Sequence, residues 1–394
     1  MTVSRRSFVR TVGAGSAGLL ALPWVTARGA EASGGAGALL LDAYEGDGDV
    51  AGRLAAGQPL RLDSNENPYG PAPAVVDAIR AALGEANRYP YAQTAALRAA
   101  IARANGGLRD DQVALGAGSA EVLRTAVLAF TSATKPLVVA VPTYESPARD
   151  AALFGNAVRE VAVRDDLTLD LGRLAEAARG AGLVFLCNPN NPTGIVHDRA
   201  AVEGFIARVR RESPETTILV DEAYHEYVDD PRYASMIPLA STDARVVVSR
   251  TFSKVHGMAG LRIGYGIGTA ATIAAMSRYR IGLAVNVIAA TAAVAALDQP
   301  ASHIERQRAL NGEARELTMR FFRDQRCTVY PSQTNFMVAD VRRDVKTFQA
   351  ACREQGVLVG RSFPRMETKA RISIATPDEI RQSFDVFKRV MQAV

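Results

Sequence analysis

Short, continuously apolar stretches alternate along the chain with longer stretches whose apolar positions recur at helical spacing. A short continuous apolar run is typical of a strand that is buried on both faces of a sheet. Such runs occur at residues 137–141, 183–186, 217–220 and 245–248. Helical spacing occurs at residues 74–83, 94–104, 119–130 and 200–211. The alternation predicts an α/β fold, in which a mostly parallel sheet is covered by helices on both faces.

The pattern changes after Asn286. Long helical stretches extend to about residue 326, and short strand-like stretches at 335–339, 357–359 and 371–374 then occur among helices. We therefore expect a large domain at residues 83–283 and a second, smaller α/β domain at residues 284–394. Residues 33–82 are expected to form a Gly/Ala-rich linker followed by an N-terminal arm.

Polar clusters follow several predicted strands, and ligands of parallel sheets bind at the carboxyl ends of strands. Residues 116–121 read GAGSAE and open a helix, which makes them either an ordinary turn or a phosphate-binding site. Residues 188–194 read NPNNPTG, which is either a rigid prolyl loop or a scaffold that aims amides at a ligand. Asp221 is either a helix cap or a buried carboxylate that requires a cation.

Lys254 follows the strand at 245–248 and lies among hydroxyls, glycines and one arginine. A lone lysine is usually solvated, but a desolvated lysine near other cations has a lowered pKa and can attack a carbonyl carbon. A phosphate cradle, a Schiff-base lysine, a buried carboxylate and polar groups from an asparagine turn and a tyrosine are together the parts that hold pyridoxal phosphate. The four clusters jointly predict that cofactor.

Composition excludes several other classes. The chain has 394 residues, 48% hydrophobic and 22% charged, and its surplus of five positive charges is dispersed rather than clustered, which argues against nucleic-acid binding. The three cysteines, Cys187, Cys327 and Cys352, are far apart in the sequence and form no CxxC pair. We therefore expect neither a disulfide framework nor a metal site from them. The four histidines are equally scattered, and we predict no metal cofactor.

The N-terminus has the features of a targeting segment. Arg5 and Arg6 precede a Gly/Ala-rich, weakly apolar run, and residues 30–32 read AEA, which is a small-x-small cleavage pattern. The run is too short and glycine-rich for a stable membrane span. We therefore expect residues 1–32 to be a twin-arginine signal peptide, which exports folded proteins and would place this one in the periplasm or outside the cell.

Four motifs in this order resemble the aspartate-aminotransferase-type (fold type I) pyridoxal-phosphate enzymes, and within them histidinol-phosphate aminotransferase. They are NENPYGP (65–71), NPNNPTG (188–194), DEAY (221–224) and SRTFSKVHGMAGLRIGY (249–265), with RYP at 88–90. The resemblance covers roughly residues 60–390. It implies a mostly parallel, seven-stranded-type sheet between helices, with a smaller α/β C-terminal domain.

The resemblance also implies catalytic roles. Lys254 would form the Schiff base with the cofactor and then move a proton between the substrate α-carbon and the cofactor. Asp221 would pair with the pyridine nitrogen and keep it protonated. Asn191 and Tyr224 would hydrogen-bond the ring hydroxyl and lower the pKa of the Schiff base.

Further roles concern the rest of the cofactor and the subunits. By the resemblance, the cofactor phosphate is bound by Ser119, Ala120, Thr251, Ser253 and Arg262. Tyr144 would stack on the ring. Tyr89 would reach the phosphate of the neighbouring subunit, which implies a homodimer with shared active sites.

The substrate residues are implied in the same way. Arg371 corresponds to the arginine that binds the α-carboxylate, and Asn67 is also assigned to the substrate. The family arginine expected after residues 356–359 is displaced by Gly360, so Arg361 is the candidate for contact with a substrate phosphate.

The implied function is pyridoxal-phosphate-dependent transamination between an L-amino acid or histidinol phosphate and a 2-oxo acid, by a ping-pong mechanism. A lyase of the same fold, such as a threonine-phosphate-type decarboxylase, stays open because the same lysine serves both reactions. A non-catalytic binding protein that keeps the fold predicts loss of Lys254 or Asp221, and both are present.

Overall fold

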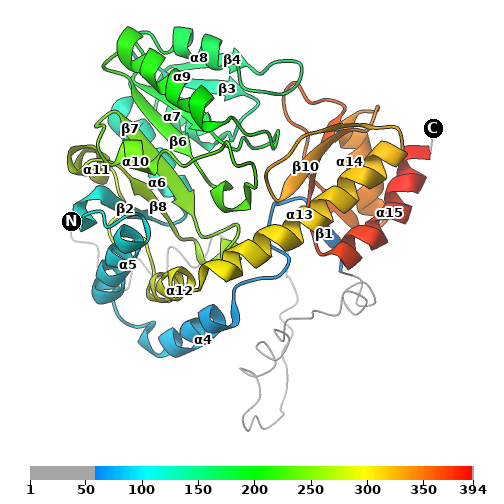
Figure 1. Cartoon of the computed structure of the whole chain (residues 1–394), viewed down its shortest axis with the longest axis horizontal. Helices are drawn as coiled ribbons and strands as arrows, with labels where there is room; N and C mark the ends of the chain where they lie inside the picture. The colour runs from blue at the N-terminus through cyan, green and yellow to red at the C-terminus, as the bar shows by residue number, and fades with distance from the viewer. Residues whose placement is uncertain (1–57, 393–394) are drawn as a thin grey trace, which may run out of the picture. The chain divides into compact units, whose positions relative to one another are not determined.

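The computed structural model describes residues 58–392 (Figure 1). The predicted signal peptide at residues 1–32 and the linker up to residue 57 lie outside the described residues. Within the described part no helix is long and apolar enough to cross a membrane. The same residues hold no group of three His, Cys, Asp or Glu side chains placed to bind a metal ion.

A seven-stranded sheet has the strand order β2-β8-β7-β6-β5-β3-β4. Its strands are β2 (Val113–Gly116), β3 (Leu137–Val141), β4 (Val158–Ala162), β5 (Leu183–Cys187), β6 (Thr217–Asp221), β7 (Val246–Thr251) and β8 (Gly264–Ile267). Strands β3 to β7 pair in parallel, whereas β8 is antiparallel to both β7 and β2. The predicted α/β fold with a mostly parallel seven-stranded sheet is confirmed.

Both faces of this sheet are buried, which explains its continuously apolar strands. In β5, Val184 and Leu186 belong to one core, and Leu183, Phe185 and Cys187 belong to the other. The first core includes residues of α4 (Pro73–Ala82), α5 (Tyr91–Ala104), α8 (Leu171–Ala177), α9 (Arg199–Glu212), α10 (Ile237–Ala240) and α12 (Val287–Leu297). The second includes residues of α6 (Ser119–Phe130), α7 (Ser146–Leu153) and α11 (Ala270–Ser277).

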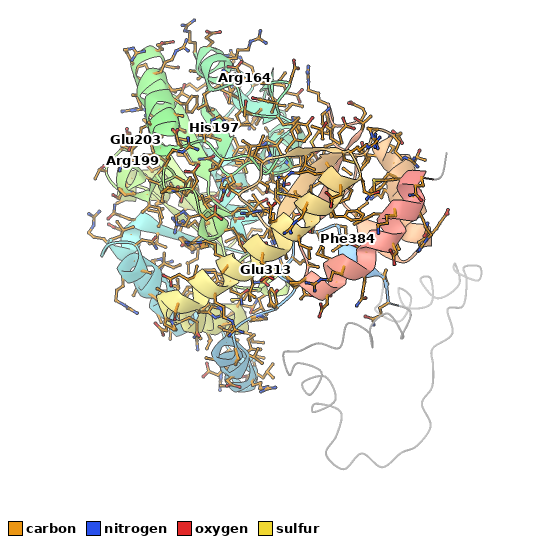
Figure 2. All side chains as sticks on the ribbon, turned by 45° about the vertical axis from the view of Figure 1, so that its right-hand side comes forward. Arg164, His197, Arg199, Glu203, Glu313 and Phe384 are labelled. Carbon is orange, nitrogen blue, oxygen red and sulfur yellow. The ribbon has the colours of Figure 1, made fainter. Side chains whose placement is uncertain are left out.

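Helix α9 shows how local sequence sets these elements. Asp198 caps its first turn, because a carboxylate oxygen accepts from the backbone N–H of Ala201 at 2.8 Å. Its apolar side chains recur at helical spacing and are buried, whereas Arg199 and Glu203 form an exposed ion pair of 2.7 Å one turn apart (Figure 2). The short 3-10 helices are η2 (Leu83–Glu85), η3 (Asp110–Gln112), η4 (His225–Tyr227) and η5 (Ala259–Leu261).

The C-terminal part has its own antiparallel sheet of order β12-β10-β9. Its strands are β9 (Thr328–Tyr330), β10 (Phe336–Asp340) and β12 (Lys369–Ser373), and they pack with α13 (Ala301–Asp324), α14 (Val345–Glu354) and α15 (Pro377–Gln392). Phe384 of α15 stacks on Phe321 of α13, with ring centroids 4.0 Å apart (Figure 2). Strand β1 (Leu60–Leu62) pairs in parallel with β11 (Val357–Val359), so the chain before α4 is tied to the C-terminal part.

The domain boundary between residues 283 and 284 stays a prediction. Helix α12 lies on the C-terminal side of that boundary, yet it packs against α4 and α5 beside the large sheet (Figure 1). Its alanine-rich sequence suits this place, because small side chains let neighbouring helices approach closely.

Candidate active site

A cavity of about 540 Å³ opens at the carboxyl ends of β6 and β7. Parallel strands place ligand sites at this edge of a sheet. Of the residues predicted to bind cofactor or substrate, those that line the cavity are Ser119, Ala120, Tyr144, Asn191, Asp221, Tyr224, Thr251, Ser253, Lys254, Arg262, Arg361 and Arg371. Asn67 and Tyr89 do not line it.

One end of the cavity is rich in N–H, hydroxyl and guanidinium groups. Helix α6 begins at Ser119, directly after Gly118, which has a φ of 77° and no side chain to cap the helix. A Cβ atom at Gly118 would overlap the guanidinium of Arg262, so the glycine lets that cation lie against the start of the helix. The hydroxyl of Thr251 donates to that of Ser253 at 2.9 Å. A helix N-terminus with an arginine and hydroxyls fits a phosphate.

Asp221 is the last residue of β6 and is 3% exposed. One carboxylate oxygen accepts from the Ser249 hydroxyl at 3.0 Å, and the other accepts from the Cys187 thiol at 3.8 Å. It forms no ion pair within the described residues, and burial raises its pKa to about 7. An ionised carboxylate in this place needs a cation, which a protonated ring nitrogen supplies.

The next carboxylate, Glu222, is fully partnered instead. Both Nε and Nη2 of Arg250 donate to it, at 3.0 and 2.9 Å, and the Ser235 hydroxyl and the Met236 N–H also donate to it. This buried network positions the loop after β6, and of the two adjacent carboxylates only Asp221 lines the cavity. Arg250 was not singled out by the sequence, where it reads as one arginine among many.

Lys254 lies just beyond β7, and its Nζ donates to the backbone carbonyl of Asn65 at 3.0 Å. Burial lowers the pKa of Lys254 to about 8, and the cationic Arg371 and Arg262 act in the same direction. At slightly alkaline pH the amine is therefore partly unprotonated, which a nucleophile and general base requires.

Tyr224 is buried against Phe336 in an edge-to-face arrangement, with ring centroids 5.2 Å apart. Burial raises the pKa of its hydroxyl, so the phenol stays protonated. Its oxygen accepts a hydrogen bond of 3.1 Å from the side-chain amide of Asn65. Asn65 is a second residue that sequence reasoning missed, because it was noted only as part of the NENPYGP motif.

Arg371 projects from β12 and is 8% exposed. Its Nη1 donates to Asn191 at 2.8 Å and its Nη2 donates to the carbonyl of Asp63 at 2.6 Å, whereas its Nε has no partner among the described residues. A Cβ at Gly360 would meet the Arg371 carbonyl oxygen at 2.6 Å and its Nε at 3.1 Å. A side chain at position 360 would therefore collide with the backbone of Arg371 and crowd its guanidinium.

Arg361 lies at the exposed rim and forms an ion pair of 2.6 Å with Glu145. Its guanidinium also lies over the ring of Phe363, 4.2 Å from the centroid. Glu145 and Phe363 line the cavity, and neither was predicted from the sequence. The rim of the cavity is thus formed by a neutralised ion pair and an aromatic ring.

The remaining two predicted residues lie elsewhere. The amide of Asn67 donates to the Val255 carbonyl at 2.9 Å, and its oxygen accepts from the Tyr69 N–H, so this side chain holds the segment before α4 against the turn after Lys254. Tyr89 is 72% exposed on the surface next to Tyr91. Neither contacts the cavity within this chain.

Comparison with known proteins gives consistent results. A family model described as aminotransferase class I and II matches residues 58–386. The chain is 35% identical to a histidinol-phosphate aminotransferase of Symbiobacterium thermophilum, over 87% of this chain and 93% of the relative. It is 36% identical to an aromatic amino acid aminotransferase of Thermobifida fusca, over 82% of this chain and 88% of the relative.

Solved structures of aminotransferases are also similar to this chain. The histidinol-phosphate aminotransferase of Sinorhizobium meliloti in complex with pyridoxal-5'-phosphate has a TM-score of 0.79 and 28% identity, covering 87% of this chain and 94% of that chain. A mutant aspartate aminotransferase of Thermus thermophilus has a TM-score of 0.74 at 23% identity, covering 86% of this chain and 98% of that chain, and shows the fold alone.

Proposed function

This chain belongs to the class I and II aminotransferase family, and on that premise we propose that it moves an amino group between an L-amino acid or histidinol phosphate and a 2-oxo acid. It is a transaminase, and pyridoxal 5'-phosphate is its cofactor. The observation that carries the proposal is the convergence of Lys254, Asp221 and Arg262 on one cavity.

The residues present fit the cofactor. Asp221 would hold a proton on the ring nitrogen, because an uncompensated buried carboxylate stabilises a cation beside it. The start of α6, the hydroxyls of Thr251 and Ser253, and the Arg262 guanidinium would bind the phosphate. When bound, pyridoxal phosphate supplies the electron sink for the pair released at the substrate α-carbon.

Lys254 and Arg371 would then act on the substrate. Lys254 would hold the cofactor covalently, and its amine, once free, would take the proton from the substrate α-carbon and deliver it to the cofactor. Arg371, which lines the cavity, would bind the α-carboxylate and so orient the bond that breaks. We propose that the first product leaves before the 2-oxo acid binds, because donor and acceptor would use the same arginine.

A homodimer with shared active sites forms part of the proposal. Exposed apolar side chains gather at the start of α5 and in the segment after α11, and they are Tyr89, Tyr91, Tyr279, Ile281 and Leu283. Thr94 of α5 borders the same small depression as Ile281 and Leu283. Exposed large apolar side chains on such segments support an interface there.

Export by the twin-arginine route is the second part. The N-terminal pattern of paired arginines, apolar run and AEA sequence supports it. An enzyme that folds around a cofactor before leaving the cytoplasm suits a route that moves folded proteins.

A half-reaction screen tests the function. Purified holoenzyme is mixed with L-glutamate, L-phenylalanine or histidinol phosphate, and its visible absorbance band is followed together with the released product. Transamination predicts loss of the band, release of the matching oxo product and no CO2. Release of CO2 would instead identify a decarboxylase.

The matched variants are Lys254→Ala and Lys346→Ala. We expect Lys254→Ala to lose the lysine-dependent visible band and turnover, whereas Lys346→Ala, an exposed lysine on α14, keeps both. A wild type that stays colourless with added cofactor contradicts the proposal.

A further inference from the structure

Asn65 lies in the segment between β1 and α4 and is 1% exposed. Its φ of 54° is in the left-handed region, which asparagine tolerates better than most side chains. Its backbone and side-chain polar groups contact Ser373 of β12, Asn335 before β10, Lys254 and Tyr224. A buried asparagine whose groups are all engaged at a catalytic site is a candidate for more than packing.

The hydrogen bonds around Asn65 fix the orientation of its amide. The Asn65 backbone N–H can only donate, and it lies 2.8 Å from the Ser373 hydroxyl oxygen, which must therefore accept. Among residues 58–392 the hydroxyl proton of Ser373 has no acceptor other than the side chain of Asn65, 3.0 Å away. The Asn65 atom that receives this proton must be the amide oxygen.

The same series of hydrogen bonds fixes the direction of the Tyr224 hydroxyl proton. Because the Asn65 oxygen faces Ser373, its NH2 group faces Tyr224 and donates to the phenol oxygen at 3.1 Å. A phenol has one proton. That proton cannot point at a donor, and no acceptor for it lies within hydrogen-bonding distance among residues 58–392. It must therefore be directed into the cavity that Tyr224 lines.

We propose that Asn65 is a positioning residue that makes the Tyr224 hydroxyl a one-way donor toward the ring oxygen of the cofactor. This inference rests on the proposed role of Tyr224 at that oxygen. A hydrogen bond donated to the ring oxygen stabilises its deprotonated form and so lowers the pKa of the lysine-bound cofactor. Through Asn65 and Tyr224, Ser373 at the end of β12 thus contributes to the protonation of the cofactor.

The test replaces the side-chain donor of Asn65 by an acceptor. Asn65→Asp keeps the size and the left-handed backbone but replaces the NH2 group by an acceptor, so the Tyr224 proton turns away from the cavity. The measurement is the pH midpoint of the change in the visible absorbance of the holoenzyme. It is made for Asn65→Asp with Tyr224 present and again in a Tyr224→Phe background.

The second background separates two effects. The new carboxylate raises the midpoint electrostatically in both backgrounds, whereas loss of the tyrosine's donated bond acts only when Tyr224 is present. We expect Asn65→Asp to raise the proton affinity roughly tenfold more in the Tyr224 background than in the Tyr224→Phe background. Equal shifts in the two backgrounds overturn the proposal.

Two further variants keep the test decisive. Asn65→Gly keeps the positive φ and removes the donor without adding charge, and we expect a rise of about two- to threefold that again requires Tyr224. If Asn65→Asp does not fold, Asn65→Gly can be compared in the same two backgrounds, with Tyr224 and with Tyr224→Phe. Asn335→Ala removes a hydrogen bond of 2.9 Å to the Asn65 carbonyl but leaves the amide orientation intact, so it should show no Tyr224-dependent shift.

The two proposals fail in different ways. A wild-type protein without a titratable visible band contradicts the proposed function. A normal wild-type titration, with shifts that do not depend on Tyr224, contradicts only the role of Asn65.

Discussion

Replacing Asp221 by asparagine should stabilise the cofactor-free protein. Burial raises the pKa of Asp221 from 3.8 to about 7. At about 1.4 kcal/mol per pKa unit, ionising this side chain in the folded state costs about 4 kcal/mol. Asparagine avoids that cost but weakens the hydrogen bonds from Ser249 and Cys187, which offsets about 1–2 kcal/mol. We expect a net gain of about 2–3 kcal/mol in the free energy of unfolding above neutral pH.

The gain must depend on pH in one direction. A folded-state pKa of about 7 and an unfolded value of 3.8 mean that the folded protein holds an extra proton between these values. Wild-type stability therefore falls as pH rises from about 4 to about 7 and is then constant with respect to this group. The difference between Asp221→Asn and wild type should be smallest near pH 4 and reach its plateau above pH 7.

Urea unfolding of the cofactor-free proteins between pH 4.5 and 8.5 measures this difference directly. Asp378→Asn serves as the control, because Asp378 is an exposed carboxylate on α15 paired with Arg381. A pH-independent difference for Asp221→Asn, or a less stable variant at pH 8.5, would refute the reasoning. In Asp221→Asn, the affinity for the cofactor should also fall about a hundredfold, because the ring nitrogen loses its buried counter-charge.

Three further results are expected. Gly118→Ala should lower the free energy of unfolding by about 1–2 kcal/mol and weaken cofactor binding at least tenfold in a spectroscopic titration, because its φ is positive and its Cβ displaces Arg262. Glu145→Gln should raise kcat/KM roughly three- to tenfold for amino donors with a distal anionic group, because Arg361 loses its counter-charge. The kcat/KM for donors with a neutral distal group should not change, and equal changes for both donor classes would contradict this. Changing both arginines of the predicted export signal to lysine should retain the precursor in the cytoplasm, as cell fractionation would show; continued export argues against the twin-arginine route.

The sequence predicted the strands that are buried on both faces. The apolar runs at 137–141 and 183–186 correspond to β3 and β5, because burial on both faces removes any polar alternation. Strand β8 was missed. It reads GYGI, and a Cβ at Gly264 would overlap the backbone of Ser119 while one at Gly266 would crowd Val122. Close approach to α6 requires glycines there, and glycines make a strand look like a loop.

Apart from Tyr89, the predicted cofactor residues come together in one cavity because their motifs follow the end of a strand or open a helix. Cys187 was missed for a different reason. As the last residue of an apolar run it reads as core, and its contact with Asp221 depends on the β5–β6 register, in which these two residues are paired. Nothing in the local sequence specifies a partner 34 positions away.

The residues between Lys254 and Arg262 also have roles that depend on contacts with distant parts of the chain. Val255 and Met258 are each 1% exposed and belong to hydrophobic cores, and burial lowers the pKa of His256 to about 4, so the imidazole is neutral near pH 7. Gly257 has a φ of 67°, and a Cβ there would overlap the backbone of Gly70. The turn after the lysine is thus shaped to receive the segment that carries Asn65, so the NENPYGP motif contributes to the site through backbone contact with this turn as well as through its side chains.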